Sequence, residues 1–499
     1  MAVIAPDTLL LNWLLALPFF GALCVALFPR FALRASSERE AAALPRAPLV
    51  LGALVCVMAV ALAVSLVPLT LGGEPVPADY WWTRDLYHLR FEANAFSALV
   101  VLVLHTLGLL VHLHLAGLPR VEDAHRRGAL LLAAQGCGAA ATLSADVVLL
   151  VFFVEAGVVA LWLFASLDSP RTAERLLMTA HVGGLLLLVG VLVMWQKAGD
   201  SSLSALPLLL LSASPAALRT IGLLVLLGLL PLLAAVPGHG WLSGLARGSP
   251  AALAAAVLLP PVGGVVILKL LPGSLAMPLV HSLAGLGFAL GIATLWWGAL
   301  RAWLAKGLLE LAVWLTVAHS GYLLIALAAA ATAAGSPRLV QGAALHLVLT
   351  PLALVALWSA AAAAAACVGT DGLAGLSGLF SRVPVAGIAL LCGGLSLAGL
   401  PPLAGFQPQR LLLSALLDAG RHWTVVAVLF ADLLIVVALV DAFRRAFLRG
   451  QAPPLRWTSG WLSVPLIVST LALLAIGIWS GPISGWGELV SREVLSISP

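Results

Sequence analysis

Four ionisable side chains lie inside long apolar runs of this sequence: Glu155, Lys269, His319 and Asp432. Glu155 occupies the middle of residues 146–167, DVVLLVFFVEAGVVALWLFASL, in which the opening Asp146 is the only other charge. A charge at that depth costs at least ~2.5 kcal/mol, and ionisable groups kept there usually serve ion or proton movement. Carboxylate, ammonium and imidazole groups can pass protons along bridging water, so these residues indicate proton translocation.

Each of these side chains also has a structural interpretation. Glu155 could be a protonated core carboxyl inherited from an active ancestor, and Lys269, one turn from the end of its run, could reach the interface. His319 could be a satisfied core histidine, and Asp432 could pair with Arg410 or with a local hydroxyl. The remaining candidates are interpreted as structural: His181, His346 and the helix-end charges Asp441, Arg444 and Arg445.

No metal or cofactor site is predicted. The histidines His105, His112 and His114 are spaced by seven and two residues, which does not place all three on one helical face, and no carboxylate or thiol accompanies them. None of the five cysteines belongs to a CxxC pair. The sequence has no Gly-rich phosphate loop and no flavin or iron–sulfur motif, so we expect no catalytic redox site in this chain.

The composition identifies the class of protein that must position these groups. The 499 residues are 62% hydrophobic and only 9% charged, against roughly 25% charged in soluble domains. Continuous apolar runs of helical length recur from end to end, and the mean hydropathy is +1.10. The sequence therefore predicts an all-α polytopic membrane protein. The net charge of +5 belongs to loops and does not indicate nucleic-acid binding.

Fourteen membrane-spanning helices are predicted, joined by connections too short for a separate soluble domain. The spans are 8–28, 48–70, 93–116, 128–144, 146–167, 175–195, 217–238, 251–271, 276–299, 309–333, 340–366, 383–404, 421–443 and 461–484. The first run follows Asp7 and lacks a basic leader, so we expect it to be retained as a helix. The loops that follow odd-numbered spans carry the basic residues Arg34, Arg39, Arg120, Arg171, Arg247, Arg301, Arg382 and Arg449. The positive-inside rule then predicts both termini on the non-cytoplasmic side of a bacterial-type inner membrane.

Two of the predicted helices are interrupted by proline and glycine. One break lies at Pro231 and Pro237, and the other covers residues 399–406, GLPPLAGF. Paired breaks of this kind indicate inverted repeats, as in many transporters, although single breaks are also common as ordinary kinks. We expect four parts: helices 1–3 over residues 1–127, a first five-helix repeat over 128–271, a second over 272–443, and a last helix with its tail over 444–499.

Five segments, in order, resemble the antiporter-like membrane subunits of respiratory complex I and their relatives in Mrp antiporters and membrane-bound hydrogenases, most closely the M-type subunit. They are residues 146–164 around Glu155, 237–242 (PGHGWL), 265–270 (VVILKL), 318–322 (AHSGY) and 394–406 (GLSLAGLPPLAGF). The resemblance covers most of the chain. It implies a fold of about fourteen spans with broken seventh and twelfth helices, and a buried Glu–Lys pair that switches during proton transfer.

Several charged positions of that family are replaced in this chain. The seventh-helix lysine that partners the glutamate falls at Leu232, the twelfth-helix lysine or glutamate at Gln409, and the eleventh-helix histidine at Thr350. The chain keeps the family's motif segments, but it lacks several of the family's charged side chains. If Glu155 switches, it must rely on Lys269, on water or on a neighbouring subunit.

Three functions follow from this pattern. The first is a proton-translocating membrane-arm subunit of a complex I-like NADH:quinone oxidoreductase, driven by a redox module in other subunits. The second is a structural or vestigial subunit with an incomplete proton path. The third is an Mrp-type cation/proton antiporter subunit. In each case the expected partners are other membrane-arm subunits, the lipid bilayer, and protons or cations, without nucleic acid.

Overall fold

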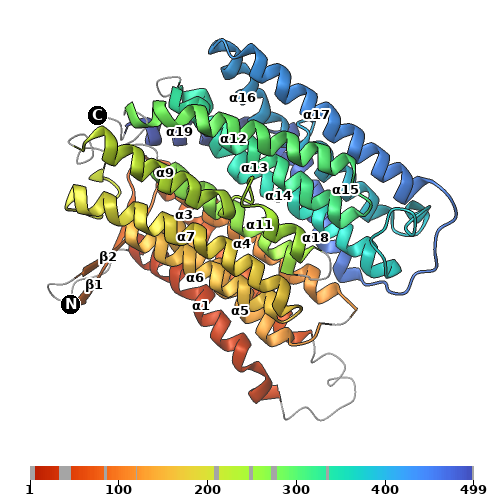
Figure 1. The fold of residues 1–499 in the computed structure, drawn as a ribbon. Helices are drawn as coiled ribbons and strands as arrows, with labels where there is room; N and C mark the ends of the chain where they lie inside the picture. Colours follow the sequence, from red (N-terminus) through yellow and green to blue (C-terminus); the bar gives the residue numbers. More distant parts are fainter. Residues whose placement is uncertain are drawn as a thin grey trace.

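The computed structural model describes residues 6–32, 46–83, 87–119, 121–206, 213–246, 251–270, 278–332 and 336–496. Four of the basic residues used to predict the orientation, Arg34, Arg39, Arg120 and Arg247, lie outside these ranges. The described part is a bundle of α-helices with one two-stranded hairpin (Figure 1). Such an architecture satisfies every backbone hydrogen bond within each helix, as a hydrocarbon surrounding requires.

The first half comprises the helices before the break near residue 237 and the two helices that follow it. They are α1 (Pro6–Ala32), α3 (Ala47–Thr70), α4 (Ala95–Gly117), α5 (Ala124–Leu143), α6 (Val147–Ser166), α7 (Pro170–Ala198), α9 (Pro215–Leu232), α10 (Gly240–Leu245) and α11 (Ala251–Leu270). The second half consists of α12 (Pro278–Trp303), α13 (Leu308–Thr332), α14 (Pro337–Val368), α15 (Pro384–Leu397), α16 (Phe406–Asp418), α17 (His422–Phe443), α18 (Gly460–Ile478) and α19 (Gly481–Ser496).

Twelve of the described helices are long and apolar enough to cross a membrane, and the chain is a multi-pass integral membrane protein. The other two predicted spans correspond to α5 and α15. Helix α5 is rich in alanine and glycine and has Arg126 and Arg127 in its first turn. Helix α15 has only 14 residues before the helix is interrupted. The total of fourteen spans therefore stays a prediction.

Local signals in the sequence fix several helix ends near the candidate residues. Asp146 caps α6, the helix of Glu155, by accepting hydrogen bonds from the amides of Val148 and Leu149 at 2.8 and 3.1 Å. Helix α7 ends at Gly199, whose φ of 73° lies in the left-handed region that glycine adopts without strain. These caps set the rotation and height at which α6 and α7 face each other.

Two groups of five helices pack in corresponding ways. In the first, α5 contacts α6, α6 contacts α7, and α7 contacts α9; in the second, α12, α13, α14 and α15 make the same sequence of contacts. The half-helices after the breaks also correspond, since α10 packs on α7 and α16 on α14. Figure 1 shows the groups side by side, yellow to green and green to blue. This correspondence supports the predicted repeats, whose boundaries remain predictions.

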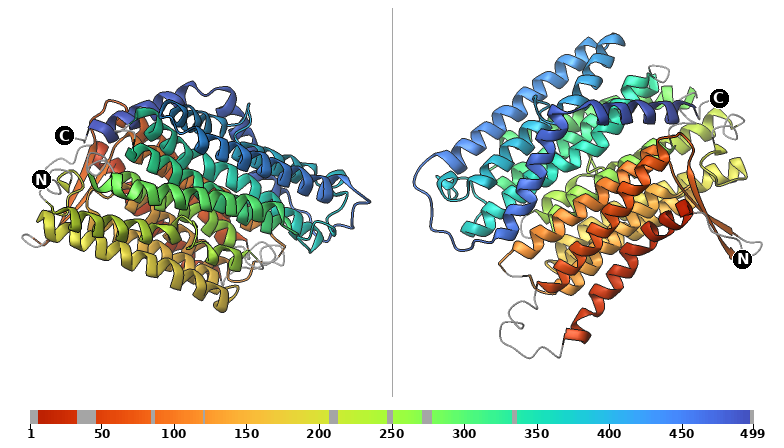
Figure 2. Two further views of the ribbon diagram at one scale, coloured as in Figure 1. Left: turned by 45° about the horizontal axis from the view of Figure 1, so that its top comes forward. Right: turned by 180° about the vertical axis from the view of Figure 1, so that it is seen from behind.

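One end of the bundle carries the hairpin and both ends of the described chain (Figure 2). Strands β1 (Val76–Thr83) and β2 (Tyr87–Ala93) pair antiparallel, and the amphipathic α19 lies nearby. Glu493 of α19 accepts hydrogen bonds from the first amides of α4, at Ala95 (3.2 Å) and Phe96 (3.4 Å). This contact fastens the last helix to the bundle.

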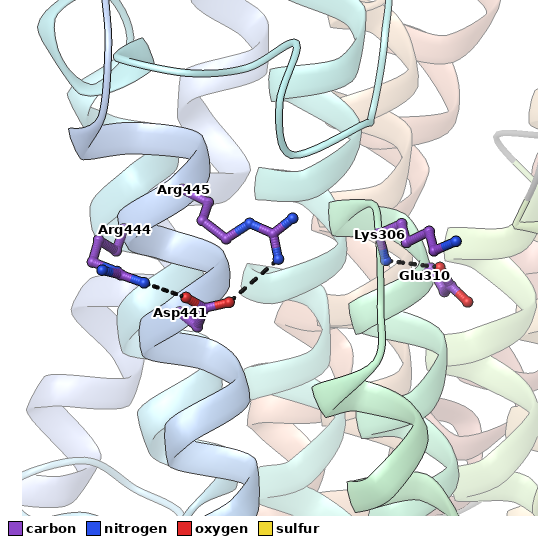
Figure 3. Close-up of polar contacts among 5 residues, drawn as sticks. All are labelled: Lys306, Glu310, Asp441, Arg444 and Arg445. Atoms are coloured by element: carbon purple, nitrogen blue, oxygen red, sulfur yellow. Dashed lines mark hydrogen bonds and ion pairs between the residues drawn. The ribbon is translucent and has the colours of Figure 1, made fainter.

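Charged residues gather where α17 ends and α13 begins. Asp441 contacts Arg444 at 2.8 Å and Arg445 at 3.3 Å, and the amide of Lys306 donates to Glu310 at 3.0 Å (Figure 3). The three side chains of the Asp441 group are 35–50% exposed. They are ion pairs at a helix end, as the sequence analysis interpreted them, and they stand apart from the buried candidates.

Candidate functional site

Glu155 contacts a histidine on the next helix of the first group. Its Oε2 lies 2.6 Å from Nδ1 of His181, which α7 presents toward α6. The other carboxylate oxygen, Oε1, has no hydrogen-bond partner among the described residues. The side chains are 20% and 48% exposed, so the pair lies at the periphery of this chain. The sequence analysis assigned His181 a structural role and left Glu155 without a partner; the structure brings the two together.

Two consecutive glycines of α7 make this contact possible. A Cβ atom at Gly184 would stand only 1.5 Å from Oε1 of Glu155, so any larger residue would displace the carboxylate. A Cβ atom at Gly183 would stand 2.6 Å from the carbonyl oxygen of Gly228 and 3.0 Å from Cγ of Pro231, both in α9. Helix α7 is therefore thin at this level, with Glu155 on one side and the end of α9 on the other.

Leu232, where the resemblance places the partner lysine, is fully buried at the end of α9. The break that follows is closed by its own residues. Trp241 donates from its indole nitrogen to the carbonyl of Pro231 at 2.9 Å, and the amide of Ala235 donates to Leu230 at 2.8 Å. The carbonyl of Pro231 also accepts from the amide of Ala234 at 3.0 Å, so the tryptophan of the PGHGWL motif adds a side-chain bond to the backbone turn that closes the break.

Lys269 lies near the end of α11 rather than at mid-helix. Its Nζ donates to the carbonyl of Ser144 at 2.7 Å, and Ser144 is the C-cap residue that follows the last residue of α5. A cation at this position interacts favourably with the C-terminal end of a helix. The side chain is half-buried and within the bundle, so Lys269 connects α11 to the α5–α6 junction that also holds Asp146.

The second five-helix group contains a stack of three aromatic rings. His319 and Tyr322 of α13 have ring centroids 5.2 Å apart, and His319 lies 5.6 Å from His346 of α14. His346 Nε2 lies 3.1 Å from the carbonyl oxygen of His319. Both ring nitrogens of His319 are buried without a hydrogen-bond partner among the described residues. Such a group calls for a water molecule or a proton-transfer role.

A cavity of about 30 Å³ adjoins this stack. Its polar lining comes from the second group: Thr316, His319, Ser320, His346 and Thr350. The remaining wall includes Leu233 at the break of α9 and Pro260 of α11, so the cavity lies where the two groups meet. A space of this size is large enough for one water molecule, although the surface that lines it is almost entirely apolar. The resemblance places the family's eleventh-helix histidine at Thr350. His346, one turn earlier on α14, lines the same cavity and is therefore the histidine that this helix contributes to the site.

Asp432 of α17 is 9% exposed and accepts a hydrogen bond from the hydroxyl of Tyr322. This hydroxyl is the local partner that the sequence analysis allowed for. The other suggested partner, Arg410, instead donates to Gln407 at 3.2 Å. Among the described residues Asp432 forms no ion pair. Its carboxylate therefore ends a row that begins at His346 and His319.

Gln409 is buried and turned toward the break between α15 and α16. Its Nε2 donates to the carbonyl of Leu397, the last residue of α15, at 2.6 Å. A Cβ atom at Gly399 would stand 1.5 Å from Oε1 of Gln409, so the glycine makes room for the amide. This side chain closes the broken helix and offers no proton-carrying group at the position where the family has one.

Of the three histidines of α4, His112 contacts the neighbouring helix α3, whereas both ring nitrogens of His105 and Nδ1 of His114 have no hydrogen-bond partner among the described residues. His112 Nδ1 lies 2.8 Å from the carbonyl oxygen of Gly108 and 3.7 Å from Sγ of Cys56. Within the described residues, no three His, Cys, Asp or Glu side chains are grouped so as to hold a metal ion.

Residues 144–434 match the family described as NADH:quinone oxidoreductase/Mrp antiporter, transmembrane. Among curated proteins, the chain is similar to NADH-quinone oxidoreductase subunit N 2 of Solidesulfovibrio magneticus, with 30% identity over 54% of this chain and 57% of that protein. It is also similar to subunit N of Deinococcus radiodurans, with 29% identity over 83% and 86%. The match thus spans little more than half of the first relative.

Two solved structures share the fold. A chain of the membrane-bound sulfane sulfur reductase, an archaeal respiratory membrane complex, superposes with a TM-score of 0.87 at 17% identity, covering 98% of both chains. A chain of respiratory complex I from Thermus thermophilus gives a TM-score of 0.82 at 20% identity, covering 97% of this chain and 99% of that one. The sequence analysis placed the chain nearest the M type, whereas both curated relatives above are N subunits.

Proposed function

Because this chain belongs to the NADH:quinone oxidoreductase/Mrp antiporter transmembrane family, we propose that it translocates protons as an antiporter-like membrane-arm subunit of a complex I-like NADH:quinone oxidoreductase. The redox chemistry takes place in other subunits, and this chain holds no cofactor. Its own contribution is a set of ionisable side chains that take up, pass on and release protons within the membrane.

The observation that carries the proposal is the 2.6 Å contact between Glu155 and His181 within membrane-spanning helices. In this contact Glu155 has a partner that can also exchange a proton. The family's usual partner, a lysine, is replaced by Leu232 in this chain. His319, Asp432 and Lys269 add proton-carrying groups beyond it. Ionisable residues at such positions face a bundle interior, a water-filled cavity or a neighbouring subunit.

The partners and the orientation belong to the same proposal. Other membrane-arm subunits cover the face on which Glu155 and His181 are exposed, and lipid covers the rest of the apolar exterior. The basic loops after odd-numbered spans lie in the cytoplasm of a bacterial-type cell, which puts both chain ends on the opposite side. That both ends lie at the same end of the bundle agrees with this arrangement (Figure 2).

A structural subunit with an incomplete proton path is the second candidate. Two observations favour it: Leu232 is fully buried among apolar residues, and Gln409 is committed to the carbonyl of Leu397. An Mrp-type antiporter subunit is the third candidate, and it would exchange cations for protons without any redox reaction.

Glu155→Gln tests the proposal in membrane vesicles that contain the assembled complex. The amide cannot ionise, and the number of protons moved per electron pair should fall while NADH oxidation continues. Glu174→Gln, an exposed carboxylate on α7, is the matched control and should have no effect. Unchanged translocation in the Glu155 variant would favour the structural subunit. Cation/proton exchange in vesicles without NADH would favour the antiporter.

A further inference from the structure

The second five-helix group lacks the proton-carrying group that the resemblance places on its broken helix. Gln409 has no protonatable state near neutral pH, and its amide is held by the carbonyl of Leu397 at 2.6 Å. A proton that reaches the cavity beside His319 therefore needs another acceptor. Building on the proposed function, we propose that this acceptor is Asp432 on α17, reached through the hydroxyl of Tyr322.

Burial singles out Asp432. Among the described residues, only two carboxylates are buried, Asp146 and Asp432. Asp146 caps α6 and accepts from Ser201, so its oxygens are occupied at a helix end. Asp432 lies near the middle of α17, at a depth where a carboxylate without a cation is costly unless it exchanges protons.

Two arginines on α16 and at the start of α17 interact with groups other than Asp432. Arg410 donates to Gln407, and Arg421 lies over the ring of Phe288 at 5.1 Å. The carboxylate accepts a hydrogen bond from the hydroxyl of Tyr322 and forms no ion pair among the described residues. A phenol is both a donor and an acceptor, so this single contact can pass a proton on without moving either side chain.

Tyr322 also reaches toward the cavity end of the row. It lies one helical turn beyond His319 on α13, and the two rings stack at 5.2 Å with an angle of 14° between their planes. The two nitrogens of His319 are buried without a partner among the described residues, and this residue lines a mostly apolar space large enough for one water molecule. The three side chains thus connect the interface between the two groups with α17, near the edge of the bundle.

The transfer is balanced in protons and needs no electrons. Because the stacked rings of His319 and Tyr322 form no direct hydrogen bond, a water molecule carries the proton from the protonated imidazole of His319 to the oxygen of Tyr322. Tyr322 releases its own hydroxyl proton to the carboxylate of Asp432. One O–H bond forms at Asp432, one N–H bond breaks at His319, and Tyr322 ends with the same number of protons.

Asp432→Asn is the principal test, performed on the assembled complex in membrane vesicles with NADH as the electron donor. Asparagine can still accept the hydrogen bond from Tyr322 but cannot take up a proton, so the change separates proton transfer from packing. We expect the rate of proton translocation to fall by about 100-fold, at the lower end of the effect of a lost acid–base group, while NADH oxidation continues. Asp432→Glu should retain much of it.

Two further variants complete the design. Tyr322→Phe keeps the stacked ring and removes the hydroxyl, and it should lower translocation to a similar degree. Asp441→Asn, on the same helix but in the exposed ion pairs of Figure 3, should leave translocation unchanged. If Asp432→Asn prevents assembly, Asp432→Glu and Tyr322→Phe decide the question.

The outcomes separate this inference from the proposed function. Wild-type translocation in Asp432→Asn or in Tyr322→Phe would overturn the role of Asp432, as would an equal loss in Asp441→Asn. The proposed function would still hold if Glu155→Gln lowered translocation in the same preparation. If neither carboxylate variant changed translocation, both conclusions would fail.

Discussion

The two five-helix groups each contain a pair of ionisable side chains at matching places. Glu155 and His181 are 26 residues apart, on the second and third helices of the first group. His319 and His346 are 27 residues apart, on the second and third helices of the second group. The first pair combines an acid with a base and is partly exposed. The second consists of two bases, stacked and enclosed.

Exposure is the difference that matters most. The side chains of the first pair are 20% and 48% exposed, while His319 and His346 are 3% and 7% exposed as residues. Ionisable residues within membrane segments usually face a bundle interior or a water-filled cavity, so a partly exposed pair fits the proposed cover by a neighbouring subunit. The enclosed pair has its cavity, its hydroxyl and its carboxylate within this chain. The first group is therefore suited to coupling with a neighbour, and the second to carrying protons internally.

The largest effect is expected from His319→Phe. Phenylalanine keeps a ring between His346 and Tyr322 but has no nitrogen, so packing persists while the proton carrier is lost. Translocation should fall by about 100-fold or more, as for loss of an acid–base group. It is measured as protons per electron pair in vesicles. His105→Phe, a buried histidine of α4 that lies outside both pairs, is the control. Normal translocation in His319→Phe would remove the second pair from the path.

Gly184→Ala tests the first pair without changing either of its members. The added methyl group would stand 1.5 Å from Glu155 Oε1 and must push the carboxylate away from His181. Overpacking of this kind costs about 1–3 kcal/mol, and translocation should drop several-fold. Gly190→Ala on the same helix places its methyl group 3.2 Å from Leu224 Cβ, so it overpacks α7 more mildly and away from Glu155, and it should lower translocation much less. Equal behaviour of the two variants would show that the position of Glu155 is unimportant.

Substitutions of His181 should produce a smaller effect that depends on charge. His181→Lys keeps a cationic donor beside Glu155 and resembles the glutamate–lysine pair of the family, so we expect most of the translocation to remain. His181→Gln keeps only a neutral hydrogen bond, and we expect a loss of about threefold, as for a partly exposed ion pair. Both variants are compared at equal amounts of assembled complex. A greater loss with lysine than with glutamine would contradict a charge-dependent role.

The smallest effect is expected at Lys269, which belongs to neither pair. Lys269→Gln still donates to the carbonyl of Ser144 but carries no ionisable ammonium, so translocation should fall modestly and the stability by roughly 0.3–1 kcal/mol, the typical contribution of a cation at a helix C-terminus. Lys269→Met loses the hydrogen bond as well and should lower the stability by about 1 kcal/mol more. Thermal unfolding in detergent measures the difference. A stability loss without any change in translocation would make Lys269 a purely structural residue.

The membrane class, the helix positions and both breaks could be predicted because continuous apolar runs leave few alternatives in a bilayer. The two histidine contacts could not. A single histidine in an apolar helix has no periodic signal, and the neighbour it faces depends on helix rotation. The pair Gly183–Gly184 next to His181 was a usable signal, since consecutive glycines permit a close approach. Asp432 and Tyr322 are 110 residues apart, and only packing brings them together.

The contact between Glu155 and His181 also bears on how this subunit is made. If neighbouring subunits cover this pair in an assembled complex, as proposed, a newly inserted chain presents it to lipid first. A proton moved across the 2.6 Å contact, from a charged imidazole to the carboxylate, leaves both side chains neutral without any exchange with water. The subunit can then wait in the bilayer at lower cost, and separate its charges again once a polar partner covers them. Biogenesis and quality control would thus act on the same two residues as turnover.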